Sequence, residues 1–235
     1  MLDQDTPSDR IVSAALRLAE ARGWRDLTLS EISAEAGVPL SDLRRTFKTK
    51  ADILRDFTRA VDDEVMRRLA ISSTDGPRDR LFDVVITRFE VLTPYKAALR
   101  RIHEDLRLRP GAAAMQLGAA ARSQYWMLQA AGINPEGSLG LLRVKGLLAV
   151  YADVFSIWLE DDDPGMARTM AALDRRLRRG EDVVRRVERV CDGIENLVRS
   201  LKGHRTSAPR PAAGPAPETQ PGPAPDMPGA SPSQA

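Results

Sequence analysis

Apolar side chains recur at helical spacing along most of this chain, and no segment alternates them as a half-buried strand would. Between residues 9 and 202 they fall three or four positions apart, in runs that glycine and proline interrupt. This periodicity predicts an all-α protein, because such helices must bury their apolar stripes against one another. The expected helices are ten: 9–22 capped by Ser8 or Asp9, 29–36, 39–47, one capped by Thr49 and extending to Leu69, 78–92, 94–107, 111–131, 135–160, 164–179 and 181–202.

Composition divides the chain into three parts. Residues 8–70 and 78–202 carry the helical pattern, and they are expected to form two helical domains. Nine of the 16 prolines fall between Pro209 and Pro232, in a segment that cannot bury enough apolar surface to offset its ordering entropy. We therefore expect residues 203–235 to be a disordered tail, with a polyproline ligand for a partner domain as the alternative.

The sequence lacks the residues that several functional classes require. One cysteine excludes a disulfide framework, and Cys191, His103 and His204 lack the spacing of a zinc site, so neither metal nor cofactor is expected. The acidic run at 161–163 is expected to be a solvated helix junction. No stretch is apolar enough for a transmembrane helix, and the acidic N-terminus is unlike a signal peptide. Without catalytic motifs as well, the chain is expected to be cytoplasmic and not an enzyme.

Two short helices joined by a glycine turn form the first functional pattern. The ranges 29–36 and 39–47 flank Gly37 and have the length and punctuation of a helix-turn-helix. The second helix would expose polar side chains that can enter a major groove, and two lysines follow that could bind phosphate. The expected small core is Ile32, Ala36, Val38, Leu43 and Phe47, and the expected exposed face is Leu40, Ser41, Arg44, Arg45 and Thr46, followed by Lys48 and Lys50.

The positive charge in this part of the chain is concentrated around the helix-turn-helix pattern. Residues 1–65 sum to −3, whereas residues 39–50 sum to +3. A DNA reader needs a local basic footprint more than a basic domain. Asp42 opposes the footprint unless it caps the helix or pairs with Arg45. The alternative to DNA binding is plain packing, since two amphipathic helices around a glycine are common in all-α proteins.

The stretch Arg10–Leu54 resembles the N-terminal DNA-binding domain of TetR/AcrR-type transcriptional regulators. The matching residues are Ile11, Val12, Ala14, Ala15, Leu16, Gly23, Trp24, Leu27, Thr28, Ile32, Ala36, Gly37, Val38, Leu43, Phe47, Lys50, Ile53 and Leu54. The resemblance implies a homodimeric repressor whose third helix reads double-stranded DNA and whose C-terminal domain binds a small molecule that releases DNA. The candidate DNA contacts are Thr28, Pro39, Ser41, Arg44, Arg45, Thr46, Lys48 and Lys50. Arg44 stands where the family usually has a phosphate-binding tyrosine, and arginine can also bind phosphate.

The C-terminal half is similar to a second group with the same fold, the lipid-binding accessory proteins of ubiquinone biosynthesis. The similarity covers residues 143–177, with Trp158-Leu159 before an acidic turn and Thr169 before Leu173. It implies, as an alternative function, a domain that encloses an isoprenoid lipid and no longer binds DNA. On either reading, aromatic and apolar side chains either fill the core or line an apolar ligand cavity. The candidates are Tyr125, Trp126, Leu148, Tyr151, Phe155 and Trp158.

The last helix carries a regular apolar stripe. Val183, Val187, Val190, Ile194, Leu197 and Leu201 are spaced as the seam of a helix that packs on another helix, with arginines crowding the remainder. A homodimer interface is the first interpretation, because a terminal stripe with charged flanks suits a symmetric helix pair. Docking on the same chain and a basic amphipathic helix on an anionic membrane are the alternatives, the latter matching the lipid-binding group.

Overall fold

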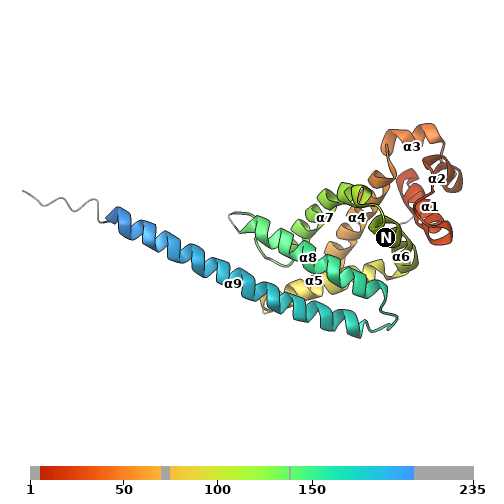
Figure 1. Ribbon diagram of the computed structural model, residues 1–235. Coiled ribbons are helices and arrows are strands. Elements are labelled where there is room, and N and C mark those ends of the chain that lie inside the picture. The colour runs from red at the N-terminus through yellow and green to blue at the C-terminus, as the bar shows by residue number, and fades with distance from the viewer. Residues whose placement is uncertain (1–5, 70–74, 138, 204–235) are drawn as a thin grey trace, which may run out of the picture. The chain divides into compact units, whose positions relative to one another are not determined.

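The structure is a computed structural model that describes residues 6–69, 75–137 and 139–203, with the side chains of residues 188 and 190–203 left aside. Within these ranges it consists of helices and turns without a strand (Figure 1). The elements are α1 (Pro7–Arg22), α2 (Leu29–Ala36), α3 (Leu40–Thr46), α4 (Lys50–Arg68), α5 (Pro77–Leu92), a 3₁₀ turn (Thr93–Tyr95), α6 (Lys96–Arg107), α7 (Pro110–Ala130), α8 (Gly140–Leu159) and α9 (Ala167–Gly203). The predicted all-α class is confirmed, and the predicted tail beyond residue 203 lies outside the described residues.

The first helices begin and end where local hydrogen bonds allow. Thr6 caps α1 by accepting a hydrogen bond from the Asp9 amide at 3.1 Å, so the expected cap at Ser8 or Asp9 is wrong by two or three residues. Pro7 takes the first helical position, where its missing N–H is no loss. Helix α2 has the predicted bounds, and Gly37 ends it in the left-handed region at φ 61°, which a side chain rarely adopts.

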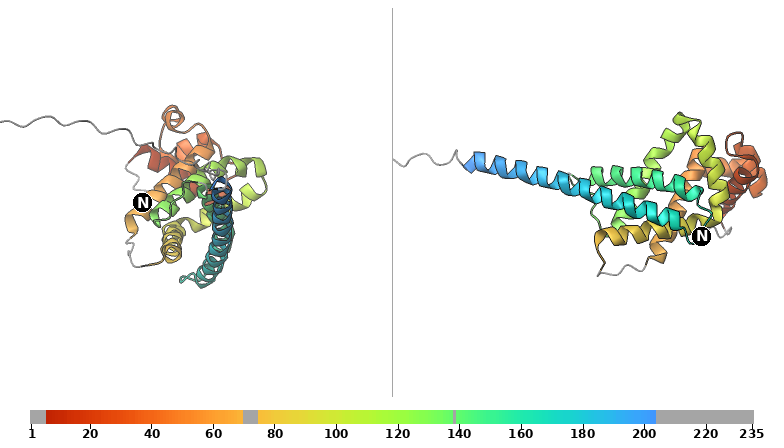
Figure 2. Two further views of the ribbon diagram at one scale, coloured as in Figure 1. Left: turned by 90° about the vertical axis from the view of Figure 1, so that its left-hand side faces the viewer. Right: turned by 60° about the horizontal axis from the view of Figure 1, so that its bottom comes forward.

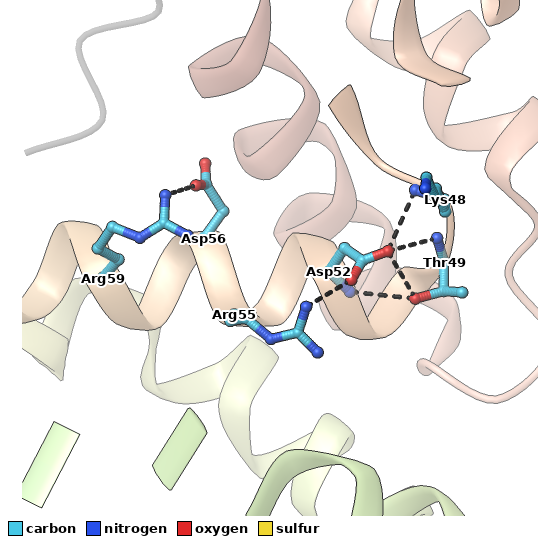
Figure 3. Close-up of polar contacts among 6 residues, drawn as sticks. All are labelled: Lys48, Thr49, Asp52, Arg55, Asp56 and Arg59. Carbon is cyan, nitrogen blue, oxygen red and sulfur yellow. Dashed lines mark hydrogen bonds and ion pairs between the residues drawn. The ribbon is translucent and has the colours of Figure 1, made fainter. Parts of the chain in front are cut away.

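A reciprocal capping box starts α4. Figure 3 shows the Asp52 carboxylate accepting the backbone N–H groups of Lys48 and Thr49 at 3.1 and 2.9 Å, while the Thr49 hydroxyl accepts the Asp52 amide at 3.3 Å. Burial raises the pKa of the Asp52 carboxyl, but these hydrogen bonds outweigh it, and the pKa lies below its ordinary value. Pairs between Asp52 and Arg55 and between Asp56 and Arg59 follow along the exposed side of the helix. The predicted cap at Thr49 is confirmed.

Replacing Thr49 by alanine is expected to lower the free energy of unfolding by about 1 kcal/mol, because the Asp52 amide at the start of α4 loses its side-chain acceptor. The conservative change Thr49→Ser keeps the hydroxyl and should cost only a few tenths of that. Urea unfolding followed by circular dichroism measures both variants. Equal losses in the two proteins would contradict the capping role.

In the second half of the chain, two predicted helix boundaries differ from those in the structure. The helix expected from Pro135 starts at Gly140, because Gly137 adopts a φ of 78° and the preceding turn is not helical. The two last predicted helices are one, α9, which continues through Gly180. An internal glycine costs a helix only about 1 kcal/mol, and pairs between Asp174 and Arg178 and between Glu181 and Arg185 bracket the position.

The acidic run before α9 is a structured turn. Asp161 is buried, which corrects the expectation of a solvated junction, and its carboxylate accepts hydrogen bonds from the amide and hydroxyl of Thr169 at 2.9 and 2.6 Å. Asp163 accepts the amides of Gly165 and Ala167 at 3.1 and 3.0 Å. These carboxylates satisfy N–H groups at the start of α9 that no preceding helical turn can reach.

Helix α4 runs from the α1–α3 group into the middle of the second helical group, where it contacts α5 and α7 (Figure 1). Helix α1 packs on α2 and on α6, so the α1–α3 group is joined to the rest of the fold both through α4 and through α6. Helix α8 and the first part of α9 run side by side (Figure 2), with an ion pair between Asp153 and Arg176. None of the helices in the described ranges has the length and hydropathy needed to cross a membrane.

Candidate functional site

Helix α3 lies on a small core and presents a polar face. All five residues predicted for this core are buried. Ser41, Arg44, Arg45 and Thr46 are exposed, as predicted, and Pro39 is the residue that precedes the helix. In the described part of the chain the side chains of Arg44 and Lys48 make no hydrogen bond or ion pair. Their cationic groups are therefore available to an external anion.

Asp42 pairs with Arg45 on the same face. The Arg45 guanidinium donates to the Asp42 carboxylate at 2.6 Å, and 76% of the arginine side chain is exposed. Exposed ion pairs of this kind contribute about 0–1 kcal/mol. Arg45 can exchange this partner for a phosphate or a base edge at little cost.

Two of the predicted DNA contacts are already engaged. The Lys50 ammonium group donates to the carbonyl oxygens of Trp24 and Arg25 at 2.7 and 3.0 Å and lies over the Trp24 ring. Burial lowers the pKa of Lys50, with the charge of Arg109 as a smaller cause. The Thr28 hydroxyl is occupied in the capping box of α2 with Glu31. In this arrangement both side chains support the α1–α2 turn.

A carboxylate that sequence reasoning missed holds the same turn. Asp105 on α6 accepts the backbone amides of Trp24 and Arg25 at 2.7 and 2.8 Å. The turn between α1 and α2 is thus held by an anion from α6 and by the Lys50 cation from α4. The sequence offers no signal for this contact, because Asp105 lies about eighty residues away from its partners.

A cavity of about 180 Å³ lies between α4, α5, α6, α7 and α8. Its wall is mainly apolar, with a few polar groups that include His103, Gln124 and Arg88. Of the six predicted ligand-binding residues, Tyr151 and Phe155 line it. The other lining residues are Leu54, Phe57, Thr58, Val61, Leu92, Leu99, Ile102, Leu106, Gln116, Ala119, Ala120 and Ser123.

The remaining four predicted ligand residues do not line this cavity, because helical phase turns them elsewhere. Trp158 is buried in the core, stacked on Phe89 with ring centroids 5.3 Å apart. The Tyr125 hydroxyl binds Glu136 at 2.8 Å, and Leu148 is half-buried outside the cavity. Trp126 is exposed and lies instead along a groove between α4 and α7.

Charges around the cavity are compensated. The Arg88 guanidinium pairs with the carboxylate of Asp62 on α4 and donates to the Tyr151 hydroxyl at 3.1 Å. Ser123 donates to the same carboxylate at 2.8 Å. Burial, and secondarily the charge of Arg107, lowers the pKa of His103, so this imidazole is neutral at pH 7.

The predicted dimerisation stripe is only partly described. Val183 is 51% exposed and Val187 is half-buried, while the side chains of Val190, Ile194, Leu197 and Leu201 lie outside the described residues. Among the described residues, no group of three or more His, Cys, Asp or Glu side chains could hold a metal ion.

Comparisons with known proteins agree with this arrangement. Residues 11–57 match the family described as bacterial regulatory proteins, tetR family. A TetR transcriptional regulator from Nitrosomonas europaea ATCC 19718 aligns with a TM-score of 0.58 at 19% identity, over 74% of this chain and 97% of that chain. A TetR transcriptional regulator from Rhodococcus sp. RHA1 aligns with a TM-score of 0.56 at 18% identity, over 74% and 94%. No curated protein matches this sequence. The predicted fold is confirmed.

Proposed function

We propose that this chain, whose residues 11–57 match the family of bacterial regulatory proteins, tetR family, is a homodimeric repressor that releases DNA when a small apolar molecule enters its cavity. The observation that carries the proposal is the exposed face of α3, with the unpaired cation of Arg44, above a buried helix-turn-helix core. As a regulator that acts on the chromosome, the protein works in the cytoplasm and needs no catalytic group.

The face of α3 has the chemistry of a major-groove reader. Arginine binds the O6 and N7 atoms of guanine in a bidentate manner, and serine or threonine reaches bases or phosphates. Arg44, Arg45, Ser41 and Thr46 supply these groups within less than two helical turns. A dimer would present the face twice, to half-sites separated by about one turn of DNA or a multiple of it.

Helix α6 offers a route from the cavity to the DNA-binding helices. Ile102, His103 and Leu106 line the cavity, and Asp105 on the same helix holds the α1–α2 turn. A ligand that shifts α6 would therefore pull on this turn, and α3 follows through α2. The coupling requires only that the ligand prefers one of two positions of α6.

The alternative of an isoprenoid-binding protein gains no support from the cavity. Pockets for drug-sized ligands measure about 300–1,000 Å³, whereas this cavity holds about 180 Å³. A polyisoprenoid chain would not fit this cavity. The groove between α4 and α7 is larger, about 780 Å³, but it is lined by the charged side chains of Arg55, Arg59, Asp63 and Arg122, which disfavour an apolar chain.

DNA selection tests the proposed function. The full chain is incubated with a pool of random duplexes, the bound fraction is sequenced after several rounds, and affinity is measured by fluorescence anisotropy. We expect enrichment of a two-fold symmetric motif bound at least a thousandfold more tightly than random DNA. A pool that stays random at moderate salt would overturn the proposal.

The variant Asp105→Asn is expected to weaken the response to ligand at least about fivefold while leaving DNA affinity within a factor of a few, because allosteric coupling of this kind is typically worth 5–150-fold. An amide oxygen accepts less strongly than a carboxylate, so the α1–α2 turn loosens from α6. Glu104→Gln is the matched control, since it removes a neighbouring carboxylate of α6 whose ion pair is with the exposed Arg101 at 3.7 Å. The readout is the shift of DNA affinity on adding a compound that binds the cavity. An unchanged shift in Asp105→Asn would refute this route.

A further inference from the structure

One buried polar side chain faces the cavity without a hydrogen bond. Gln124 is 1% exposed, lines the cavity, and its Oε1 atom has no partner. Among the described residues, it is the one buried side-chain oxygen or nitrogen atom without a hydrogen-bond partner. Leaving such a group unsatisfied is unfavourable because it loses its hydration without gaining a partner, and a bound molecule would supply that partner.

We infer that the cavity takes a small, neutral, mostly apolar molecule with one hydroxyl group, a phenol or a short alcohol, whose hydroxyl bonds the Gln124 amide. The inference rests on the proposed function, since it names the class of ligand for the same cavity. An amide presents both a donor and an acceptor, and a hydroxyl can serve either.

Charge balance around the cavity excludes ionic ligands. Arg88 is paired with Asp62, and burial lowers the pKa of His103, which favours its neutral form. A carboxylate or an ammonium ion would enter without a counter-charge and would lose its hydration, which is far more costly than burying a neutral hydroxyl. The site therefore selects against carboxylates and ammonium ions of the same shape.

The volume of the cavity suits a molecule of about one ring. An engineered apolar cavity of roughly 150 Å³ binds benzene, and the present cavity is about 180 Å³. Its wall includes the aromatic side chains of Phe57, Tyr151 and Phe155, which suit a flat apolar body. A six-membered ring with one methyl and one hydroxyl group matches both the volume and the polar contact.

Calorimetric titration of the full chain with p-cresol, toluene and benzoate at pH 7 tests the inference. We expect p-cresol to bind most tightly, toluene more weakly, and benzoate not detectably. The variant Gln124→Leu removes the amide at similar volume and should weaken p-cresol about fivefold or more, since one hydrogen bond contributes about 1 kcal/mol. Toluene should bind this variant as well as before or better. The matched control is Gln129→Leu on the exposed side of α7, which should change neither compound.

Equal affinity of the native chain for p-cresol and toluene would overturn the inference, as would equal weakening of both by Gln124→Leu. Thermal unfolding of that variant shows that its fold is intact, and Gln124→Met serves in its place if it is not. DNA affinity without any compound is measured in parallel. Sequence-specific DNA binding together with no binding of p-cresol refutes the ligand class and leaves the repressor proposal standing. Absence of specific DNA binding refutes the repressor proposal itself.

Discussion

Replacing Arg88 by methionine is expected to lower the free energy of unfolding by about 3–5 kcal/mol, the usual result of removing one partner of a buried ion pair. Arg88 is 4% exposed and pairs with Asp62, which is 7% exposed. Among the residues that the structure describes, the variant leaves the Asp62 carboxylate with a hydrogen bond from the hydroxyl of Ser123 alone. Tyr151 also loses the guanidinium group that donates to its hydroxyl. Urea denaturation gives the stability difference.

A second substitution separates the charge effect from lost packing. In the double variant Arg88→Met with Asp62→Asn no charge remains buried, and we expect recovery of more than half of the loss. The surface control is Arg67→Met, because Arg67 is 67% exposed in its pair with Glu64 and should contribute less than about 1 kcal/mol. A double variant no more stable than Arg88→Met alone would show that packing, not the unpaired charge, sets the cost.

Helix boundaries were predictable where short-range chemistry decides them. Thr28 with Glu31 and Thr49 with Asp52 are capping boxes readable three residues apart, and both hold in the structure. The sequence did not show that two predicted helices join through Gly180. A glycine can either continue or end a helix, and the contacts of the flanking residues determine which occurs. Asp161 looked solvated from its acidic neighbours, yet its partner Thr169 lies eight residues further on.

The exposed face of α3 could be predicted from the sequence, but the residues that line the cavity could not. The exposed side of α3 follows from helical period alone, since Leu43 and Phe47 mark the buried side. The cavity depends on which way α8 is turned between α5 and α6. Phe155 faces the cavity, whereas Trp158, three residues on, stacks on Phe89. Composition suggests aromatic ligand residues but does not say which of them pack against each other.

The double variant Arg44→Ala, Arg45→Ala is expected to reduce operator affinity at least about a hundredfold at fixed salt. Each arginine that binds a base in a bidentate manner contributes about 1–3 kcal/mol, and a dimer loses each of them twice. Fluorescence anisotropy at several salt concentrations measures the effect. Arg101→Ala on α6 removes one positive charge from an exposed arginine outside the helix-turn-helix and should leave affinity within a factor of two.

Salt dependence tells base contacts from phosphate contacts. Each phosphate contact adds about 0.9 to the slope of log K against log salt concentration for duplex DNA. If Arg44 stands in for the phosphate-binding tyrosine, Arg44→Ala alone should flatten this slope, and Lys48→Ala should do the same. If Arg45 reads a base, Arg45→Ala should keep the slope and relax the preference at one base pair of each half-site. Binding that is unchanged in affinity, slope and preference would refute the role of α3.

Replacing Asp42 on the same surface is expected to have the opposite effect on DNA affinity. Its carboxylate pairs with Arg45, a candidate DNA contact, and 43% of its side chain is exposed. Asp42→Asn should therefore strengthen binding to operator and random DNA alike by a few-fold, because it removes a repulsion that is independent of sequence. Residues 1–65 sum to −3, so nonspecific attraction is weak and the patch around α3 must supply most of the binding energy. A repressor built in this way would give up affinity for random DNA and thereby favour its operator among many competing sites.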